Sequence, residues 1–258
     1  IIDNREKVNI LSKEQIIKVC NRNFIGCDQL IFIEKDDTAD ARLKFFNSDG
    51  GESGACGNGT RCVADLISKE NGKKNIILTT LSGNLKSEIL ENNLVTTEIG
   101  KAKTKWNEIP LSNELNTLNL NIKINDKKNN EHFGGTAVNV GNPHIIFFVD
   151  ELQNFDVSII GPQLEIHKIF PEKCNVTIAQ IINKNLIKVK VWERGAGLTK
   201  ACGTAACATA FAGTLNKFTE DNTDIEFETG KLSIFIDDNK SIHMKGPVSD
   251  IKKISVKL

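Results

Sequence analysis

The amino-acid sequence predicts an α+β protein made of two related halves. The chain has 258 residues, a length that suits one large domain or two medium ones. Each half carries strand patterns, a Gly-rich loop with an acidic residue, an Ala-Cys-Gly tripeptide that opens a helix, and a hairpin. Cys56 and Cys202 lie 146 residues apart, and Gly83 and Gly230 lie 147 apart. This shared order and spacing predicts an internal duplication.

The first half begins with a helix and two strands. Ser12 and Gln15 form a capping-box pattern for a helix that runs to about residue 21. After a Gly/Ser/Asp-rich loop at 47–54, a helical pattern follows residue 59, and Gly72 is expected to cap its end. Ser82-Gly83-Asn84 is a hairpin signal. The strands expected in this half are 29–34, 41–46, 75–80, 85–90 and 94–99.

The second half repeats the order. A strand at 186–192 precedes the Gly-rich loop 193–197, and a helix of small residues runs from Thr204 to about Phe218. The strands expected after it are 225–228, 232–236 and a last one beyond Pro247 that returns to the first domain. A polar Asn/Lys-rich stretch at 101–130 separates the halves. We therefore expect a first domain of residues 1–110 plus 248–258 and a second of residues 111–247.

Composition excludes several classes of function. Lys+Arg and Asp+Glu both number 33, so the zero net charge gives no argument for a nucleic-acid partner. No apolar run is long enough to span a bilayer, and no signal peptide is visible. The seven cysteines are odd in number and lack any C-x-x-C spacing, which favours a reducing cytoplasm over disulfides or a zinc site. We expect a cytoplasmic protein with no metal and no membrane contact.

Cys56 and Cys202 each precede a helix, and this position suits proton transfer. Unpaired N–H groups and the positive end of the helix dipole favour thiolate, the reactive form of cysteine. Two such thiols, one on each related half, indicate a reaction in which the two groups play matching acid and base roles. A carbon held between them could lose a proton to one sulfur and gain one from the other, so that its configuration inverts.

Three ordered motifs resemble those of the diaminopimelate epimerase family. The first is Phe46-Asn47-Ser48-Asp49-Gly50 with Ala55-Cys56-Gly57-Asn58-Gly59-Thr60-Arg61-Cys62; the second is Gly141-Asn142-Pro143-His144; the third is Glu193-Arg194-Gly195-Ala196-Gly197-Leu198-Thr199-Lys200-Ala201-Cys202-Gly203-Thr204. The likeness runs over the whole chain and includes Gly26-Cys27-Asp28-Gln29-Leu30.

The resemblance implies an isomerase that interconverts LL- and meso-diaminopimelate without pyridoxal phosphate, another cofactor or a metal, in lysine and cell-wall precursor synthesis. It implies two pseudo-symmetric domains, each a strongly curved, barrel-like mixed sheet around a central helix, with the active site in the cleft between them, and a homodimer. Cys56 and Cys202 would be the acid/base pair, and His144 and Glu193 would help set their protonation. The implied contacts to the amino-acid substrate are Gln29, Asn47, Gly57, Asn58, Asn142, Asn175, Glu193, Arg194, Gly203 and Thr204.

Three departures and two alternatives accompany this interpretation. One departure is that Phe24-Ile25-Gly26-Cys27-Asp28 replaces a start richer in glycine. The family's opening strand, with its Gly-Asn-Asp-Phe segment, precedes the point where this chain starts, and Thr204-Ala205 stands where many relatives have Ser-Gly or Thr-Gly. A proline-racemase-like enzyme would share the chemistry with a smaller substrate, although Glu193-Arg194 favours diaminopimelate. A non-catalytic protein could instead use both helix N-termini to bind anions, and it would need no thiols.

Overall fold

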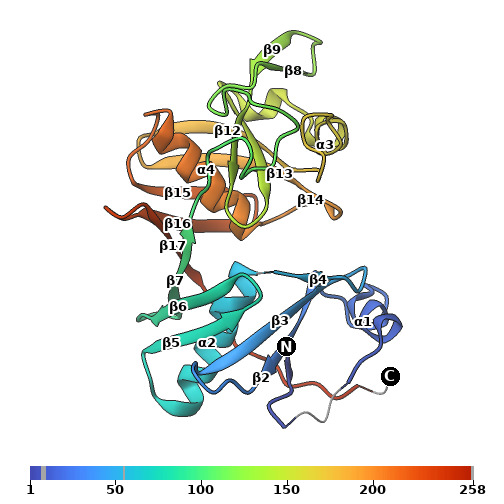
Figure 1. Ribbon diagram of the computed structural model, residues 1–258, viewed down its shortest axis with the longest axis vertical. Helices are drawn as coiled ribbons and strands as arrows, with labels where there is room; N and C mark the ends of the chain where they lie inside the picture. Colours follow the sequence, from blue (N-terminus) through green and yellow to red (C-terminus); the bar gives the residue numbers. More distant parts are fainter. Residues whose placement is uncertain (7–9, 55, 257–258) are drawn as a thin grey trace. The chain divides into compact units, whose positions relative to one another are not determined.

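The structure is a computed structural model that describes residues 1–6, 10–54 and 56–256, so Ala55 of the first Ala-Cys-Gly motif lies outside the described residues. The chain forms two compact units, Ile1–Glu98 with Gly246–Leu258, and Ile99–Lys245. It passes from the first unit to the second within β7 (Leu94–Lys101) and returns within β17 (Ser241–Pro247). Both units combine helices with a mixed sheet, which confirms the α+β class (Figure 1). The barrel-like curvature of each sheet stays a prediction.

The first unit holds helices α1 (Lys13–Cys20) and α2 (Gly57–Asn71). Its strands pair in the order β1-β2-β3-β5-β6-β7, with β4 beside β3. The β1–β2 and β3–β5 pairs are parallel, and the other pairs that we describe are antiparallel. The remaining strand bounds are β1 Ile2–Asp3, β2 Gln29–Glu34, β3 Ala41–Asn47, β4 Glu52–Ser53, β5 Asn75–Thr80 and β6 Gly83–Ile89.

Side-chain alternation gives this sheet two apolar faces. Ile31 and Phe45 belong to a cluster that packs against α2, whereas Leu30 and Phe32 pack against α1. Both helix signals in the sequence are confirmed. Ser12 and Gln15 make the expected capping box, and the αL backbone of Gly72 (φ 73°) donates to Ser68 O.

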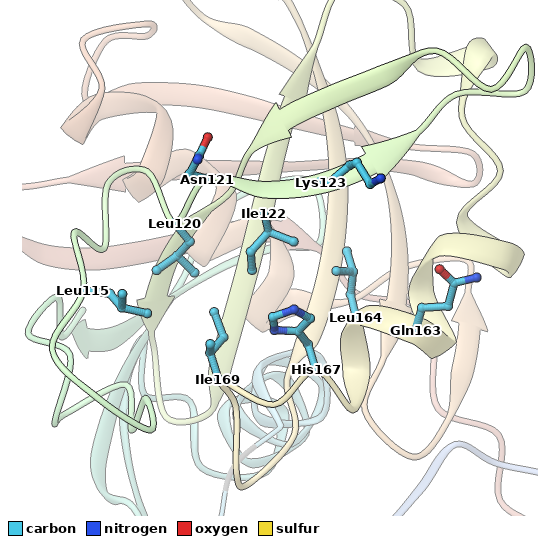
Figure 2. A pocket seen from close by; sticks show the side chains of 9 residues that line it. All are labelled: Leu115, Leu120, Asn121, Ile122, Lys123, Gln163, Leu164, His167 and Ile169. Carbon is cyan, nitrogen blue, oxygen red and sulfur yellow. The ribbon is translucent and has the colours of Figure 1, made fainter.

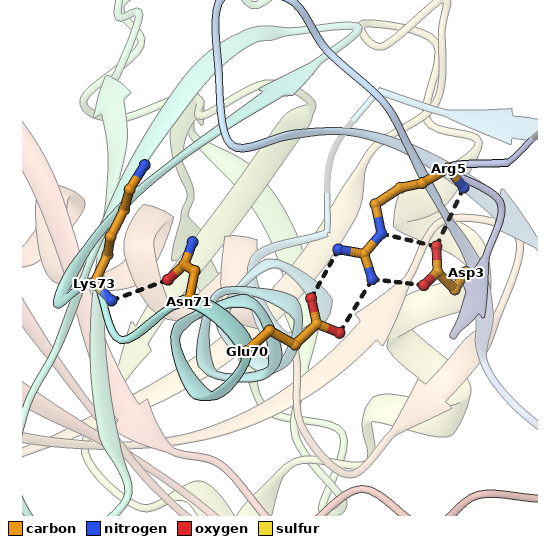
Figure 3. A network of polar contacts seen from close by, with 5 residues as sticks. All are labelled: Asp3, Arg5, Glu70, Asn71 and Lys73. Carbon is orange, nitrogen blue, oxygen red and sulfur yellow. Dashed lines mark hydrogen bonds and ion pairs between the residues drawn. The ribbon is translucent and has the colours of Figure 1, made fainter.

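The N-terminal segment is tied to the far end of α2 through Arg5 (Figure 3). Its two terminal nitrogens donate to the two carboxylate oxygens of Glu70 at 2.7 and 3.0 Å. The same guanidinium also donates to Asp3, at the end of β1. A bidentate pair of this kind fixes orientation as well as distance, so it helps to hold α2, the helix that Cys56 precedes.

The second unit holds helices α3 (Val157–Glu165) and α4 (Gly203–Leu215) and a 3-10 turn, η1 (Leu152–Asn154). Its main strands follow the order β17-β16-β15-β13-β12-β11-β10, with β14 beside β13. A separate hairpin joins β8 to β9. The strand bounds are β8 Ile122–Asn125, β9 Glu131–Gly134, β10 Thr136–Asn139, β11 Pro143–Val149, β12 Asn175–Asn183, β13 Leu186–Glu193, β14 Gly197–Thr199, β15 Asn222–Phe227 and β16 Gly230–Ile236.

Helices α4 and α3 pack against different clusters of this unit. The α4 residues Ala205, Ala206 and Cys207 are fully buried in one cluster with Val189 and Val191 of β13. The other cluster joins residues of α3 to Val176 and Ile178 of β12 and to neighbouring strands. Small side chains allow α4 to approach the strands closely, which explains why its sequence is almost free of large residues.

Strand pairing confirms the duplicated order. The succession β1-α1-β2-β3-β4-α2-β5-β6-β7 recurs as β11-α3-β12-β13-β14-α4-β15-β16-β17. The parallel pairs β1–β2 and β3–β5 recur as β11–β12 and β13–β15. The register of the strands also agrees. Phe45 pairs with Ser53 in the first half, and Val191 pairs with Thr199 in the second. Each residue of the second pair lies 146 positions after its counterpart in the first. Cys56 and Cys202 therefore occupy equivalent places in the two halves.

One expected element is wrong. Residues 248–256 contain no strand, and the last strand is β17, which ends at Pro247. The tail is held instead by single contacts such as the bond from Val248 N to Asn93 O (2.9 Å). Its apolar residues do not alternate strictly with polar ones, and Ile251 and Ile254 are exposed, so it offers no apolar face to a sheet. Across the described residues, no helix is long and apolar enough to cross a membrane.

Candidate active site

The two motif cysteines occupy equivalent helix N-caps. Cys56 precedes α2 with φ −145° and ψ 100°, and Cys202 precedes α4 with φ −144° and ψ 117°. Each thiol therefore lies beside backbone N–H groups that have no partner within the helix. This confirms that the sequence located both helix starts correctly.

Gly59 shapes the surroundings of Cys56. Its backbone N–H donates to the Cys56 Sγ at 3.3 Å. A Cβ at residue 59 would lie 2.3 Å from Ile31 Cδ1 and 3.2 Å from the same sulfur. Glycine therefore lets the first turn of α2 pack this closely on β2 without displacing the end of the Ile31 side chain, and that packing brings the N–H donor to the thiol. A donor in this position would stabilise negative charge on sulfur.

Cys202 has different surroundings. Its side chain is buried, and its Sγ lies 3.4 Å from Thr204 Oγ1. Burial raises the pKa of the Cys202 thiol well above its usual value, and the neighbouring Glu193 carboxylate raises it further. The Thr204 hydroxyl and the nearby Ala205 N–H oppose this rise in pKa. The balance favours the protonated thiol at neutral pH.

Three candidate residues lie side by side on adjoining strands of the second unit. His144 on β11 pairs with Asn175 on β12. Val176 pairs with Trp192, so Asn175 lies opposite Glu193 on β13. Because neighbouring Ile146 and Val191 belong to the α4 cluster, side-chain alternation points all three toward α4. The strands therefore bring His144, Asn175 and Glu193 to the side on which Cys202 begins its helix.

His144 is fully buried and uncharged at neutral pH. Burial, aided by the positive charge of Arg194, lowers the pKa of His144 to about 3. Its Nε2 lies 2.8 Å from Asn142 Oδ1, so Nε2–H donates when the Asn142 amide is oriented in this way. Asn142 follows Gly141, whose positive φ (107°) makes the turn between β10 and β11.

We predict that His144 makes the protein less stable in mild acid. In the unfolded chain its pKa returns to about 6.5, so between pH 6.5 and 3 the unfolded state binds more protons and the free energy of unfolding falls as the pH falls. The loss attributable to His144 between pH 7 and pH 5 is about 2 kcal/mol. Urea unfolding of wild type and His144→Gln at both pH values measures it. The exposed-site variant His132→Gln is the control, and an equal pH dependence in all three proteins would contradict the prediction.

Arg194, which directly follows β13, is held by one side-chain oxygen and one backbone oxygen. Its N–H donates to Asn175 Oδ1 at 2.9 Å, and its Nη1 donates to Glu172 O at 2.8 Å. Asn175 in turn donates to Pro143 O at 3.0 Å. The residue is exposed, and its guanidinium keeps further donors that suit a carboxylate.

The first unit carries a smaller set of candidates. Gln29 Nε2 donates to Asn47 Oδ1 at 2.9 Å across the β2–β3 pair. In the duplication, these two positions correspond to Asn175 and Glu193, each 146 residues later. Asn58, in the first turn of α2, accepts a bond from Arg61 Nη2 at 3.1 Å. Gly57 and Gly203 are the first helical residues after the two cysteines.

The other cysteines have structural surroundings. Cys27 Sγ lies 3.5 Å from Cys20 Sγ, and burial raises the pKa of Cys20 to about 12. Burial also raises the pKa of Cys62 and of Cys174, whose thiol donates to Leu164 O. Cys207 lies in the α4 core. Among the described residues, no three His, Cys, Asp or Glu side chains are grouped so that they could hold a metal ion.

A cavity of about 410 Å³ lies elsewhere in the second unit (Figure 2). It is bounded by the end of α3, the loop that follows it and the segment that leads into β8. None of the candidate site residues line it, so this cavity is separate from the candidate site. The lining residues are Leu115, Leu120, Asn121, Ile122, Lys123, Gln163, Leu164, His167 and Ile169.

Comparisons with known proteins agree with the motifs. The family model described as diaminopimelate epimerase matches residues 1–105 and 136–251. A diaminopimelate epimerase of Pelagibacter ubique is 66% identical over 258 residues, which is 100% of this chain and 94% of that protein.

Two solved structures share the fold at low identity. A "Predicted Epimerase" from Pseudomonas aeruginosa has a TM-score of 0.67 at 13% identity, covering 95% of this chain and 88% of that one. A "probable proline racemase" from Agrobacterium radiobacter has a TM-score of 0.65 at 10% identity, covering 94% and 81%. The family-model match and the full-length relative show that this chain belongs to the diaminopimelate epimerase family.

Proposed function

We propose that the protein interconverts LL- and meso-diaminopimelate by two-base proton transfer at one α-carbon, in lysine and cell-wall precursor synthesis. The observation that carries the proposal is the pair of cysteines at equivalent helix N-caps in a member of this family. Inversion requires a base on one side of the carbon and an acid on the other. Two related halves that each present a thiol at a helix start supply one group of each kind.

The surroundings of the two thiols suit opposite roles. Cys56, with the Gly59 N–H directed at its sulfur, would act as the thiolate that removes the α-proton. Cys202, buried beside Glu193, would act as the thiol that delivers a proton to the opposite face. The Cα–H bond breaks as an S–H bond forms on Cys56, and the Cys202 S–H bond breaks as a new Cα–H bond forms. The roles exchange in the reverse direction.

The remaining candidates would bind the substrate and tune the thiols. Backbone N–H groups at Gly57 and Asn58, and at Gly203 and Thr204, would hold the carboxylate next to the reacting carbon and stabilise the charge that develops there. Arg194 would bind a carboxylate through its free donors. His144, neutral and buried, would set the polarity around Cys202 without adding charge. The polar side chains proposed to contact the amino acid are Gln29, Asn47, Asn142, Asn175 and Glu193.

Deuterium incorporation tests this proposal. We expect the protein in heavy water to exchange the α-hydrogen of LL-diaminopimelate and to form the meso isomer, both followed by NMR, without added cofactor. Proline, tested separately, is expected to remain unlabelled. Exchange into proline alone would favour the proline-racemase-like alternative. Binding of diaminopimelate without any exchange would favour a non-catalytic anion-binding protein.

Two further properties are part of the proposal. We infer a cytoplasmic location, which fits seven cysteines, none of which forms a disulfide. We also infer a homodimer, as the family resemblance implies. Light scattering on the purified protein is expected to give twice the chain mass of 28.5 kDa, and a stable monomer would contradict the dimer.

A further inference from the structure

Glu165, a residue outside the family motifs discussed above, joins α3 to the loop that carries Glu193 and Arg194. Its side chain is buried at the C-terminal end of α3. One carboxylate oxygen accepts the indole N–H of Trp192 at 2.7 Å. The other accepts the backbone N–H of Gly195 at 3.2 Å. The two bonded residues lie immediately before Glu193 and immediately after Arg194 in the chain.

Close packing between α3 and Trp192 supports this contact. A Cβ on Gly161 would lie 2.4 Å from Trp192 Cγ, so only glycine in α3 lets the indole lie against the helix. Trp192 faces α3 while its neighbour Glu193 faces α4, because side chains alternate along β13. A fixed Trp192 therefore fixes the direction of Glu193.

The backbone of the same segment is held from two sides. Asn175 accepts the Arg194 N–H, and Glu165 accepts the next N–H, that of Gly195. Gly195 and Gly197 both have positive φ (76° and 83°), so this loop has little steric preference of its own for one conformation. The Ala196 N–H donates to Glu193 O at 3.0 Å, and β14 pairs with β13, so the turn is closed within its own hairpin. Partners outside the hairpin add to this, and Glu165 is one that contacts the loop from another element.

We propose that Glu165 is a positioning residue for the epimerase reaction. It would hold the 193–197 loop so that the Glu193 carboxylate faces Cys202 and the Arg194 guanidinium faces the substrate carboxylate. The proposal rests on the proposed function for its kinetic consequences, but the contact itself can be tested independently. A carboxylate is suited to this role because it accepts two bonds on separate oxygens, whereas an amide has only one oxygen.

The test compares Glu165→Gln with Glu226→Gln, a matched control. Glu226 is a partly buried carboxylate of the same unit that pairs with Lys188 and Lys231 on the sheet. We expect Glu165→Gln to lower kcat/KM for diaminopimelate by about 10- to 100-fold, because small displacements of reacting groups cost rate steeply. We expect KM to rise as well, since Arg194 would be misplaced. Merely losing folded enzyme would lower the apparent kcat and leave KM unchanged. The control is expected to keep both values within about twofold.

A double-mutant cycle and fluorescence complete the test. Trp192→Phe removes one donor, so Glu165→Gln should cost less in that background than in wild type. The chain has two tryptophans, so Trp106→Phe isolates the emission of Trp192. Glu165→Gln is expected to make that emission more accessible to acrylamide. Unchanged KM with unchanged quenching would overturn the proposal. A different result is also informative. If Glu165→Gln changed the acrylamide quenching but the wild-type protein showed no deuterium exchange into diaminopimelate, the Glu165–Trp192 contact would stand and the proposed function would be refuted.

Discussion

Cys56→Ala and Cys202→Ala are each expected to lose about 10²- to 10⁴-fold in epimerisation, the usual contribution of a positioned general acid or base. Either change removes one of the two proton carriers that inversion needs. Stability should change far less, by about 1 kcal/mol, because alanine keeps the Cβ and the helix start. The rate of meso isomer formed from LL-diaminopimelate measures the effect.

Two matched variants serve as controls for this prediction. Cys62→Ala lies in the helix that Cys56 opens, and Cys207→Ala lies in the core of the helix that Cys202 opens. Both remove a thiol from the same helix without touching its N-cap, so they are expected to keep most of the activity. Turnover retained by Cys56→Ala or Cys202→Ala would exclude the two-base mechanism, whereas loss in all four variants would indicate a general need for reduced thiols.

The sequence predicted the elements around the two cysteines well. The strands 29–34 and 75–80 have the bounds expected for them, and both helices begin directly after their cysteine. These segments carry local signals: short apolar runs bounded by polar residues, a capping box and a glycine at a helix end. The equal register of Phe45–Ser53 and Val191–Thr199 shows why the spacing of 146 residues was informative.

The first elements of the second half, β11, α3 and β12, were not predicted. Helix α3 contains Gly161 and Pro162, which disfavour a helix by local propensity, and it is stabilised by packing on β12 and β13. Its C-terminal residue, Glu165, is an ordinary acidic residue by sequence, and its link to Trp192 joins positions 27 residues apart. Strands 143–149 and 175–183 pair in parallel across α3, a non-local contact that no short motif encodes. The division into two epimerase domains and the roles of the site residues stay predictions.

Arg194→Lys is expected to raise KM for diaminopimelate by about 10- to 100-fold, with a smaller effect on kcat. Lysine keeps the positive charge but has no planar fork, so it cannot donate to Glu172 O and to a carboxylate in one fixed geometry. Hydrogen bonds to a charged group contribute about 1.5–3 kcal/mol, which corresponds to this range of affinity. Steady-state kinetics in both directions measures the change.

The retained charge makes this substitution more informative than Arg194→Ala. Alanine would also remove the positive charge that helps to lower the pKa of His144, so a lost rate could come from either cause. Lysine separates the two, because the charge stays and only the geometry of the donors changes. Arg42→Lys, at an exposed arginine that pairs with Asp36 in the first unit, is the control and should leave KM unchanged. If Arg194→Lys also left KM unchanged, Arg194 would contribute charge alone, and the substrate carboxylate would be bound chiefly by the N–H groups at the helix starts.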